Sequence, residues 1–194
     1  MQELRIQQHF IDSADLKYQA AQALGQPIAA AVQTVLACVT SGGKVLACGG
    51  GASAVDARRF AALCVAGFER ERPELAALAL CEDAALSAQA DDQALARQVR
   101  ALGQAGDVLL ALSVSGSDAG VLAAAAAAHE RDMSVVALSG RTGGDLAALL
   151  RETDVLICVP HDRAARVREV HVLVLHCLCD GVDAQLLGEQ ENPS

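Results

Sequence analysis

The 194-residue sequence predicts one α/β domain, with a five-stranded parallel sheet flanked by helices and an N-terminal helix pair. Five short apolar runs carry this prediction, because strands covered on both faces are apolar throughout instead of alternating. Each run is followed by Gly, Ser, Asp or Pro and then by an Ala- and Leu-rich helical pattern, as in repeated βα units. The predicted strands are residues 44–48, 75–80, 107–113, 134–138 and 154–159.

Two helices are predicted before the sheet, over residues 4–24 and 27–40, because Gly25 separates them and Pro27 suits a first helical position. Residues 1–41 are expected to serve oligomerisation, although packing on their own domain is an equal alternative. The α/β core is expected over 42–187, with a last helix from 162 to 187, and a flexible tail over 188–194. Gly181 in that helix marks a kink or a close helix crossing, or is incidental.

Composition excludes several classes of function. The net charge is −9, with three Phe, one Tyr and no Trp, so the chain lacks the basic surface and stacking residues of a nucleic-acid binder. There is no strongly apolar run of about 18 residues, which predicts no membrane span. The polar N-terminus predicts no secretory signal. The seven cysteines, an odd number set in apolar segments, indicate reduced and mostly buried thiols in a cytoplasmic protein.

Two loops follow predicted strands and have the composition of phosphate-binding turns. In parallel sheets, ligands bind beyond the carboxyl ends of the strands, near helix N-termini. Loop 49–53 reads GGGAS, and loop 113–118 reads SVSGSD. Taken alone, each is as well explained by a turn and a helix cap. Neither matches a nucleotide-binding motif.

Three stretches together resemble the SIS (sugar isomerase) domain. They are GGKVLACGGGASAVDARRFAA, GDVLLALSVSGSDAGVLAAAAAAHERDMSVVALSG and RVREVHVLVLHCLCD. They are similar to the subfamily that contains phosphoheptose isomerase and its non-enzymatic relative, the DnaA initiator-associating protein DiaA. The resemblance implies a three-layer SIS fold. Its isomerase members bind sedoheptulose 7-phosphate with two serine-rich loops, use acid/base residues, and often use a zinc ion.

Carried over by position, the resemblance assigns vestigial phosphate binding to four serines: Ser53, Ser113, Ser115 and Ser117. It also places Val114 where the family has a hydroxyl. Asp118 stands where the family has a serine that faces the phosphate. A carboxylate beside a bound dianion costs about 1–4 kcal/mol, depending on solvent access.

The metal-binding positions of the family are changed as well. Arg59 and Leu63 stand where the resemblance places a histidine and a glutamate, and Arg168 replaces a glutamine. Of these ligand positions only His176 is kept. The expectation is therefore no metal, no cofactor and no catalytic residue. If the chain is an enzyme, Glu169 and His176 are the candidates.

Two further hypotheses concern these side chains. The altered pocket at Arg59 and Arg168 is a candidate anion site. Histidines on an apolar helix, here His171 and His176, are more commonly packed core residues than catalysts. Glu169 is a candidate partner of Arg166, Arg168 or Arg59.

Several other stretches favour the DiaA branch, which implies a non-catalytic homotetramer that binds the replication initiator DnaA and promotes its assembly at the chromosomal origin. An acidic surface suits a basic partner. Leu186 and Leu187 are candidate oligomer or partner contacts, and Arg70 and Arg72 are either partner contacts or a solvated face. The alternative is a divergent phosphosugar isomerase of the sedoheptulose 7-phosphate type, or a sugar-phosphate-sensing domain.

Overall fold

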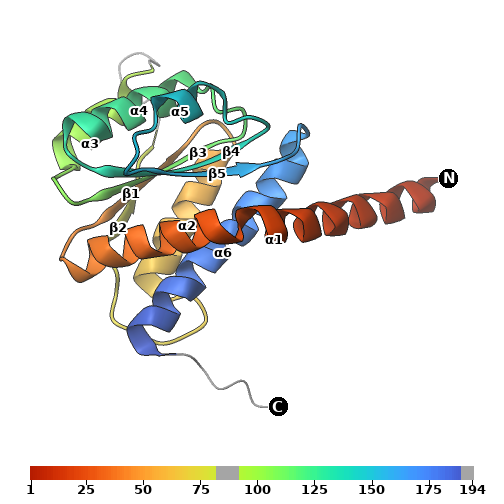
Figure 1. The fold of residues 1–194 in the computed structure, drawn as a ribbon, viewed down its shortest axis with the longest axis horizontal. Helices are drawn as coiled ribbons and strands as arrows, with labels where there is room; N and C mark the ends of the chain where they lie inside the picture. The colour runs from red at the N-terminus through yellow and green to blue at the C-terminus, as the bar shows by residue number, and fades with distance from the viewer. Residues whose placement is uncertain (82–91, 189–194) are drawn as a thin grey trace.

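The computed structural model describes residues 1–81 and 92–188 and has three layers (Figure 1). A five-stranded sheet of order β2-β1-β3-β4-β5, parallel throughout, forms the middle layer. One apolar cluster joins one face of the sheet to α1, α2 and α6, and a second joins the other face to α3, α4 and α5. The elements are α1 Gln2–Thr40, β1 Val45–Gly49, α2 Ser53–Ala66, β2 Ala77–Ala79, α3 Ala94–Leu102, β3 Val108–Ser113, α4 Ala119–Glu130, β4 Ser134–Gly140, α5 Gly144–Leu149, β5 Val155–Val159 and α6 Ala164–Leu187.

The predicted parallel sheet is confirmed, and each strand overlaps its predicted segment, although β1 ends at Gly49 and β4 at Gly140, past the predicted ends at 48 and 138. Every residue of β1 and β3, the inner strands beside the candidate loops, is buried, which explains why their sequences show no alternation. The strand predicted over 75–80 is reduced to the three residues of β2 at the edge of the sheet. Full burial thus accompanies the longer inner strands β1 and β3, and the edge strand β2 is shorter and partly exposed.

The predicted helix pair is wrong, since α1 is one 39-residue helix with Pro27 inside it. Proline removes one hydrogen bond of a helix and usually interrupts it. Here the buried stripe of α1 continues on both sides of Pro27, from Leu16 and Leu24 to Ala31 and Val35. Because both halves pack on the same core, tertiary contacts hold the helix together across the proline.

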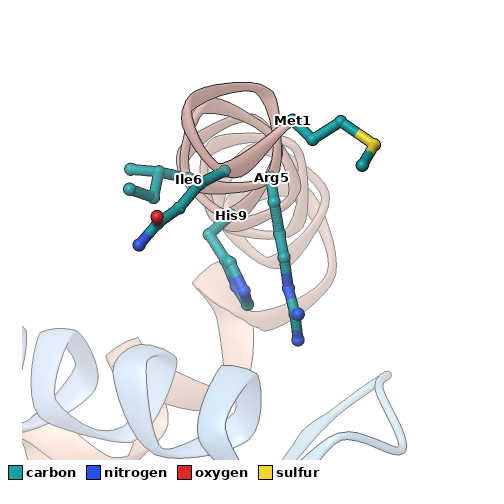
Figure 2. A pocket seen from close by; sticks show the side chains of 5 residues that line it. Met1, Arg5, Ile6 and His9 are labelled. Carbon is teal, nitrogen blue, oxygen red and sulfur yellow. The ribbon is translucent and has the colours of Figure 1, made fainter.

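The N-terminal turns of α1 extend beyond the rest of the domain (Figure 1). Residues 1–15 are called the arm here, and at its inner end His9 and Ser13 contact Arg166 and Glu169 of α6. Apolar side chains are exposed along it, with Leu4 at 69% and Phe10 at 75% exposure. Figure 2 shows a hollow on this arm lined by residues from two turns of a single helix, with Arg5 and His9 pointing to the same side. The hollow is thus one face of an exposed helix and not an enclosed site.

α6, observed over Ala164–Leu187, begins two residues later than predicted and crosses α1 closely. A Cβ atom at Gly181 would lie 2.7 Å from a methyl carbon of Val32, which confirms the close crossing as the reason for glycine. By length and composition alone, α1 and α6 are each long and apolar enough to span a membrane. In this structure α6 packs in the core through side chains such as Leu175 and Leu178.

None of the seven cysteines, all of which lie in the described residues, forms a disulfide, and four of them are buried, namely Cys38, Cys48, Cys64 and Cys179, as predicted. Burial raises the pKa of the Cys177 thiol. A raised pKa keeps a thiol protonated and unreactive. The predicted flexible tail begins with Gly188, and its remaining residues lie outside the described part of the chain.

Candidate functional site

The two candidate loops lie next to each other at the carboxyl edge of the sheet. β1 and β3 are neighbouring parallel strands in which Gly49 pairs with Leu112. Beyond that pair, the Gly50 N–H donates a 3.0 Å hydrogen bond to the Leu112 carbonyl. Loops 49–53 and 113–118 are therefore adjacent, and each leads into the N-terminus of a helix, α2 or α4.

Glycines let loop 49–53 pass close to its surroundings. A Cβ at Gly49 would lie 2.5 Å from the backbone of Ser53. Gly51 has a φ of +51°, a conformation that favours glycine. Ser53 is the first residue of α2, and its backbone N–H donates to the Gly50 carbonyl at 3.0 Å. The Ser53 side chain is buried at this turn.

In loop 113–118 the serine hydroxyls hold the loop itself. Ser113 Oγ accepts from the Gly116 N–H at 2.9 Å, and Ser115 Oγ accepts from the Ser117 N–H at 3.1 Å. Ser113 and Ser115 also donate to the same carboxylate oxygen of Asp118, at 3.4 Å from Ser115 and at shorter range from Ser113. Ser113 and Ser115 are thus brought together around Asp118, with Ser113 buried and both Ser115 and Ser117 exposed.

Arg168 does not form an unpaired cationic pocket with Arg59. Its Nε and Nη2 both donate to one oxygen of Asp56, at 3.1 and 3.0 Å. Asp56 lies on α2 with only 4% of its surface exposed, whereas Arg59, one turn later, is exposed. Because Asp56 neutralises Arg168, the predicted anion site keeps the formal charge of one arginine, Arg59, instead of two.

Glu169 faces away from loops 49–53 and 113–118, towards α1. Its carboxylate accepts a 2.7 Å hydrogen bond from Ser13 Oγ and forms a short ion pair with Arg166. Of the three partners considered from the sequence, Arg166 is the one observed. Burial opposes ionisation of Glu169, but these hydrogen bonds and nearby positive charge keep its pKa below the ordinary value. Glu169 is therefore an ionised, structurally engaged side chain.

His176 lies two turns further along α6, with its ring centroid 5.2 Å from that of Phe68. The seven residues between Glu169 and His176 correspond to about 10 Å along the helix axis. Within one protomer, these two candidate catalytic groups thus occupy separate environments. His176 is half-buried and remains accessible for proton transfer.

His171 is a fully buried histidine, in agreement with the packed-core alternative. Its Nε2 lies 3.1 Å from the Ser139 carbonyl at the end of β4. Within the described residues, His171 Nδ1 and Ser139 Oγ are buried without a hydrogen-bond partner. Burial lowers the pKa of His171 below its ordinary 6.5.

This lowered pKa predicts a loss of stability on mild acidification. Below about pH 6.5 the unfolded state binds more protons at His171 than the folded state, so the contribution is complete above that pH and falls as pH falls. Urea unfolding of the wild type and His171→Gln, at about pH 7.5 and 5.5, measures the effect. We expect the substitution to reduce the pH dependence, and an unchanged dependence would contradict the assignment.

The described residues do not fit a metal ion. No group of three or more His, Cys, Asp or Glu side chains is close enough to hold one in residues 1–81 and 92–188. Arginine and leucine, which occupy the positions of Arg59, Leu63 and Arg168, cannot act as ligands at neutral pH. We therefore assign no reaction step to a metal.

A three-layer α/β sheet with two serine- and glycine-rich loops at adjacent strand ends is the architecture of the SIS domain, and the chain belongs to that family, whose model matches residues 8–140. Relatives that match nearly the whole chain are named phosphoheptose isomerases. The phosphoheptose isomerase of Methylibium petroleiphilum is 62% identical, with 98% of both chains covered. That of Neisseria meningitidis is 50% identical over 94% of this chain and 95% of its own.

Two solved structures of phosphoheptose isomerases are also similar to this chain. The phosphoheptose isomerase of Neisseria gonorrhoeae is 46% identical and superimposes with a TM-score of 0.88, covering 95% of this chain and all of its own. The Francisella tularensis phosphoheptose isomerase is 39% identical with a TM-score of 0.89, covering 94% and 98%. The three-layer SIS fold is thus confirmed.

The prediction of a DnaA-binding scaffold is wrong. Whole-length relatives at 62% and 50% identity are named phosphoheptose isomerases, and they support the isomerase alternative. The subfamily was correctly recognised, but a particular closeness to DiaA is not shown. The prediction followed from altered side chains in the pocket and from a few short stretches, whereas the comparisons cover nearly the whole chain.

The residues considered as partner contacts have different environments. Leu186 and Leu187 lie at the end of α6 and are 38% and 40% exposed, so their role in an interface remains a prediction. Arg70 donates to the Gly188 carbonyl at 2.8 Å. Arg72 forms a buried ion pair with Asp183, which excludes the solvated-face interpretation for Arg72.

Proposed function

We propose that this protein binds a phosphorylated sugar between loops 49–53 and 113–118 and interconverts its aldose and ketose forms. The observation that carries the proposal is the combination of whole-length similarity to phosphoheptose isomerases with the adjacency of these two loops at the carboxyl ends of β1 and β3. The proposed substrate is a seven-carbon ketose phosphate, sedoheptulose 7-phosphate.

Loop geometry supports the binding part of this proposal. Backbone N–H groups at the start of a helix attract anions, and α2 and α4 both begin at this edge. Gly50 and Gly51 carry no side chain that would keep a ligand away from the backbone. Serine hydroxyls at positions 53, 113 and 115 supply further donors.

Proton transfer is proposed to involve His176. Aldose–ketose isomerisation moves one proton from C1 to C2 through an enediol, while a second proton passes from the C1 hydroxyl to the C2 oxygen. One base on one face of the enediol can take the carbon-bound proton and return it to the neighbouring carbon. Glu169 is tied to Ser13 and Arg166, which leaves His176 as the less engaged of the two candidates. Its ring contacts Phe68, beyond the C-terminal end of α2, whereas loop 49–53 lies at the N-terminus of that helix. His176 is therefore proposed for its chemistry and not for its distance from the loops of the same protomer. A neutral imidazole accepts a proton near physiological pH.

A second candidate function is sugar-phosphate recognition without turnover. One observation favours it specifically: Arg168 and Asp56 pair with each other at the site, so neither is available to the reacting carbons. Leu63 adds no ionisable group on the same helix. Both candidates share the ligand and differ only in whether it is converted.

One experiment separates them. Sedoheptulose 7-phosphate is incubated with the wild type and with His176→Gln, product is followed by NMR, and ligand-dependent melting shifts are measured in parallel. The Neisseria gonorrhoeae enzyme serves as the positive control. Turnover that is lost in His176→Gln supports isomerisation, and a melting shift without turnover supports recognition alone. Neither turnover nor a melting shift at millimolar ligand would overturn the proposal.

The arm of α1 supports a homo-oligomer, proposed to be a tetramer. Leu4, Phe10 and Ile11 expose apolar surface on it, and such surface commonly becomes buried against another subunit. Sedimentation of the wild type and of Phe10→Asp tests this. A monomer in the wild type would contradict it.

A further inference from the structure

We infer that Asp118 determines specificity and affinity at this site: its carboxylate occupies the position between loops 49–53 and 113–118 that a ligand phosphate would take, so that a sugar phosphate must displace it. This inference rests on the proposed function. It concerns how strongly the site accepts an anion, which the similarity to phosphoheptose isomerases leaves open.

Hydrogen bonds from loop 113–118 hold the carboxylate. Ser113 Oγ donates to Asp118 Oδ2 in a short hydrogen bond, and Ser115 Oγ lies 3.4 Å from the same oxygen. Hydroxyl donors of this kind bind phosphate oxygens equally well. Asp118 thus already occupies the donors that an incoming phosphate needs.

The carboxylate also reaches the opposite loop. A Cβ atom at Gly50 would lie 2.4 Å from both Cγ and Oδ1 of Asp118. The carboxylate therefore rests directly on the backbone of loop 49–53 while Ser113 holds it from loop 113–118. One anionic group spans both loops, as a bound phosphate would.

The side chain of Asp118 points to the loop serines although Asp118 stands at the start of a helix. Asp118 is the N-cap residue of α4, where an aspartate side chain ordinarily accepts a hydrogen bond from a backbone N–H of the first turn. Here it makes no such side-chain bond. Its carboxylate turns instead to the loop serines, so that Ser113 and Ser115 donate to it where they would otherwise donate to a ligand.

Asp118 is expected to weaken the binding of phosphorylated ligands for two reasons, because it occupies their hydrogen-bond donors and because it is negatively charged. A phosphate dianion and the Asp118 carboxylate cannot occupy the same donors, and like charges a few ångströms apart repel. The wild type is therefore expected to bind sugar phosphates weakly. Replacing Asp118 with serine, a short residue that also suits the N-cap position, empties the space between the loops and removes no side-chain capping bond of α4.

The test compares wild type, Asp118→Ser and Asp118→Asn by calorimetric titration with sedoheptulose 7-phosphate and with inorganic phosphate. We expect Asp118→Ser to bind sedoheptulose 7-phosphate at least about 10-fold more tightly than the wild type. Asp118→Asn removes the charge but not the bulk, and is expected to show a smaller gain. The matched control is Asp145→Ser, which removes the same charge from an exposed position in the first turn of α5, beside Gly116.

Each result decides the matter. A gain in Asp118→Ser with less than about a threefold change in Asp145→Ser supports the inference. Equal binding by the wild type and Asp118→Ser overturns it while leaving the proposed function in place. Absence of binding by any variant at about 10 mM ligand overturns both.

Discussion

Replacing Arg72 with methionine is expected to lower the free energy of unfolding by about 3–5 kcal/mol. The side chains of Arg72 and Asp183 are both only 1% exposed, so the substitution leaves a buried carboxylate without its counter-charge. The guanidinium also donates to the carbonyls of Leu63 and Cys64, at 3.1 and 2.8 Å, near the end of α2. Urea unfolding followed by circular dichroism measures the change.

Arg70→Met is the matched control, since it removes the same group two residues earlier from a more exposed hydrogen bond. It should change stability by no more than about 0.5 kcal/mol. The double variant Arg72→Met/Asp183→Leu should recover part of the loss, because it removes the unpaired charge. A loss of less than about 1 kcal/mol for Arg72→Met would show that the ion pair contributes little.

Gly116→Ala is expected to destabilise the protein by about 2–5 kcal/mol and to weaken sugar-phosphate binding at least about tenfold. Gly116 has a φ of +73°, and a Cβ there would lie 1.9 Å from the Gly143 carbonyl oxygen. A backbone oxygen cannot rotate out of the clash, as the end of a flexible side chain could. Loop 113–118 must therefore shift away from α5, which breaks the 2.8 Å hydrogen bond from Leu146 N–H to the Gly116 carbonyl.

Gly42→Ala separates the cost of a left-handed backbone conformation from the cost of the steric clash with Gly143. Gly42 has a similar φ of +80°, but no heavy atom lies within 4 Å of a Cβ placed there. It should show only the left-handed strain, about 1–2 kcal/mol, with unchanged ligand binding. If urea unfolding finds Gly116→Ala no less stable than Gly42→Ala, then the contact between loop 113–118 and α5 is less tight than described.

The strands were predictable because the sheet is buried on both faces. Runs such as those of β1 and β3 contain only residues that suit this environment, and local sequence alone identifies them. Helix α1 was not predicted as one helix because Gly25 and Pro27 are strong local breaks. The packing of Leu24 and Ala31 on one core overrides them, and that packing is a tertiary property.

The candidate site was predictable in place but not in detail. Parallel pairing of β1 with β3 brings loops 49–53 and 113–118 together, as expected for ligand sites of such sheets. The contacts of Arg168 with Asp56 and of Arg72 with Asp183 join residues more than a hundred positions apart. Neither pairing leaves a local pattern. The sequence shows that these four residues are charged, but not which of them pair with each other.

The functional prediction failed for a related reason. Substituted positions such as Arg59, Leu63 and Asp118 were interpreted as the loss of a binding site. In the structure, the Asp118 side chain accepts hydrogen bonds from Ser113 and Ser115, so these serines remain as donors between the two loops. A changed residue in a pocket therefore indicates altered affinity before it indicates a different kind of partner.

The most direct test of the central claim is where a sugar phosphate binds. Sedoheptulose 7-phosphate is titrated into isotopically labelled protein while the backbone amide signals are followed by NMR. Saturable shifts concentrated in Gly50, Gly51, Ser53 and residues 113–118 are the predicted result. Saturable shifts that leave these amides unchanged, or no shifts at millimolar ligand, would contradict the account.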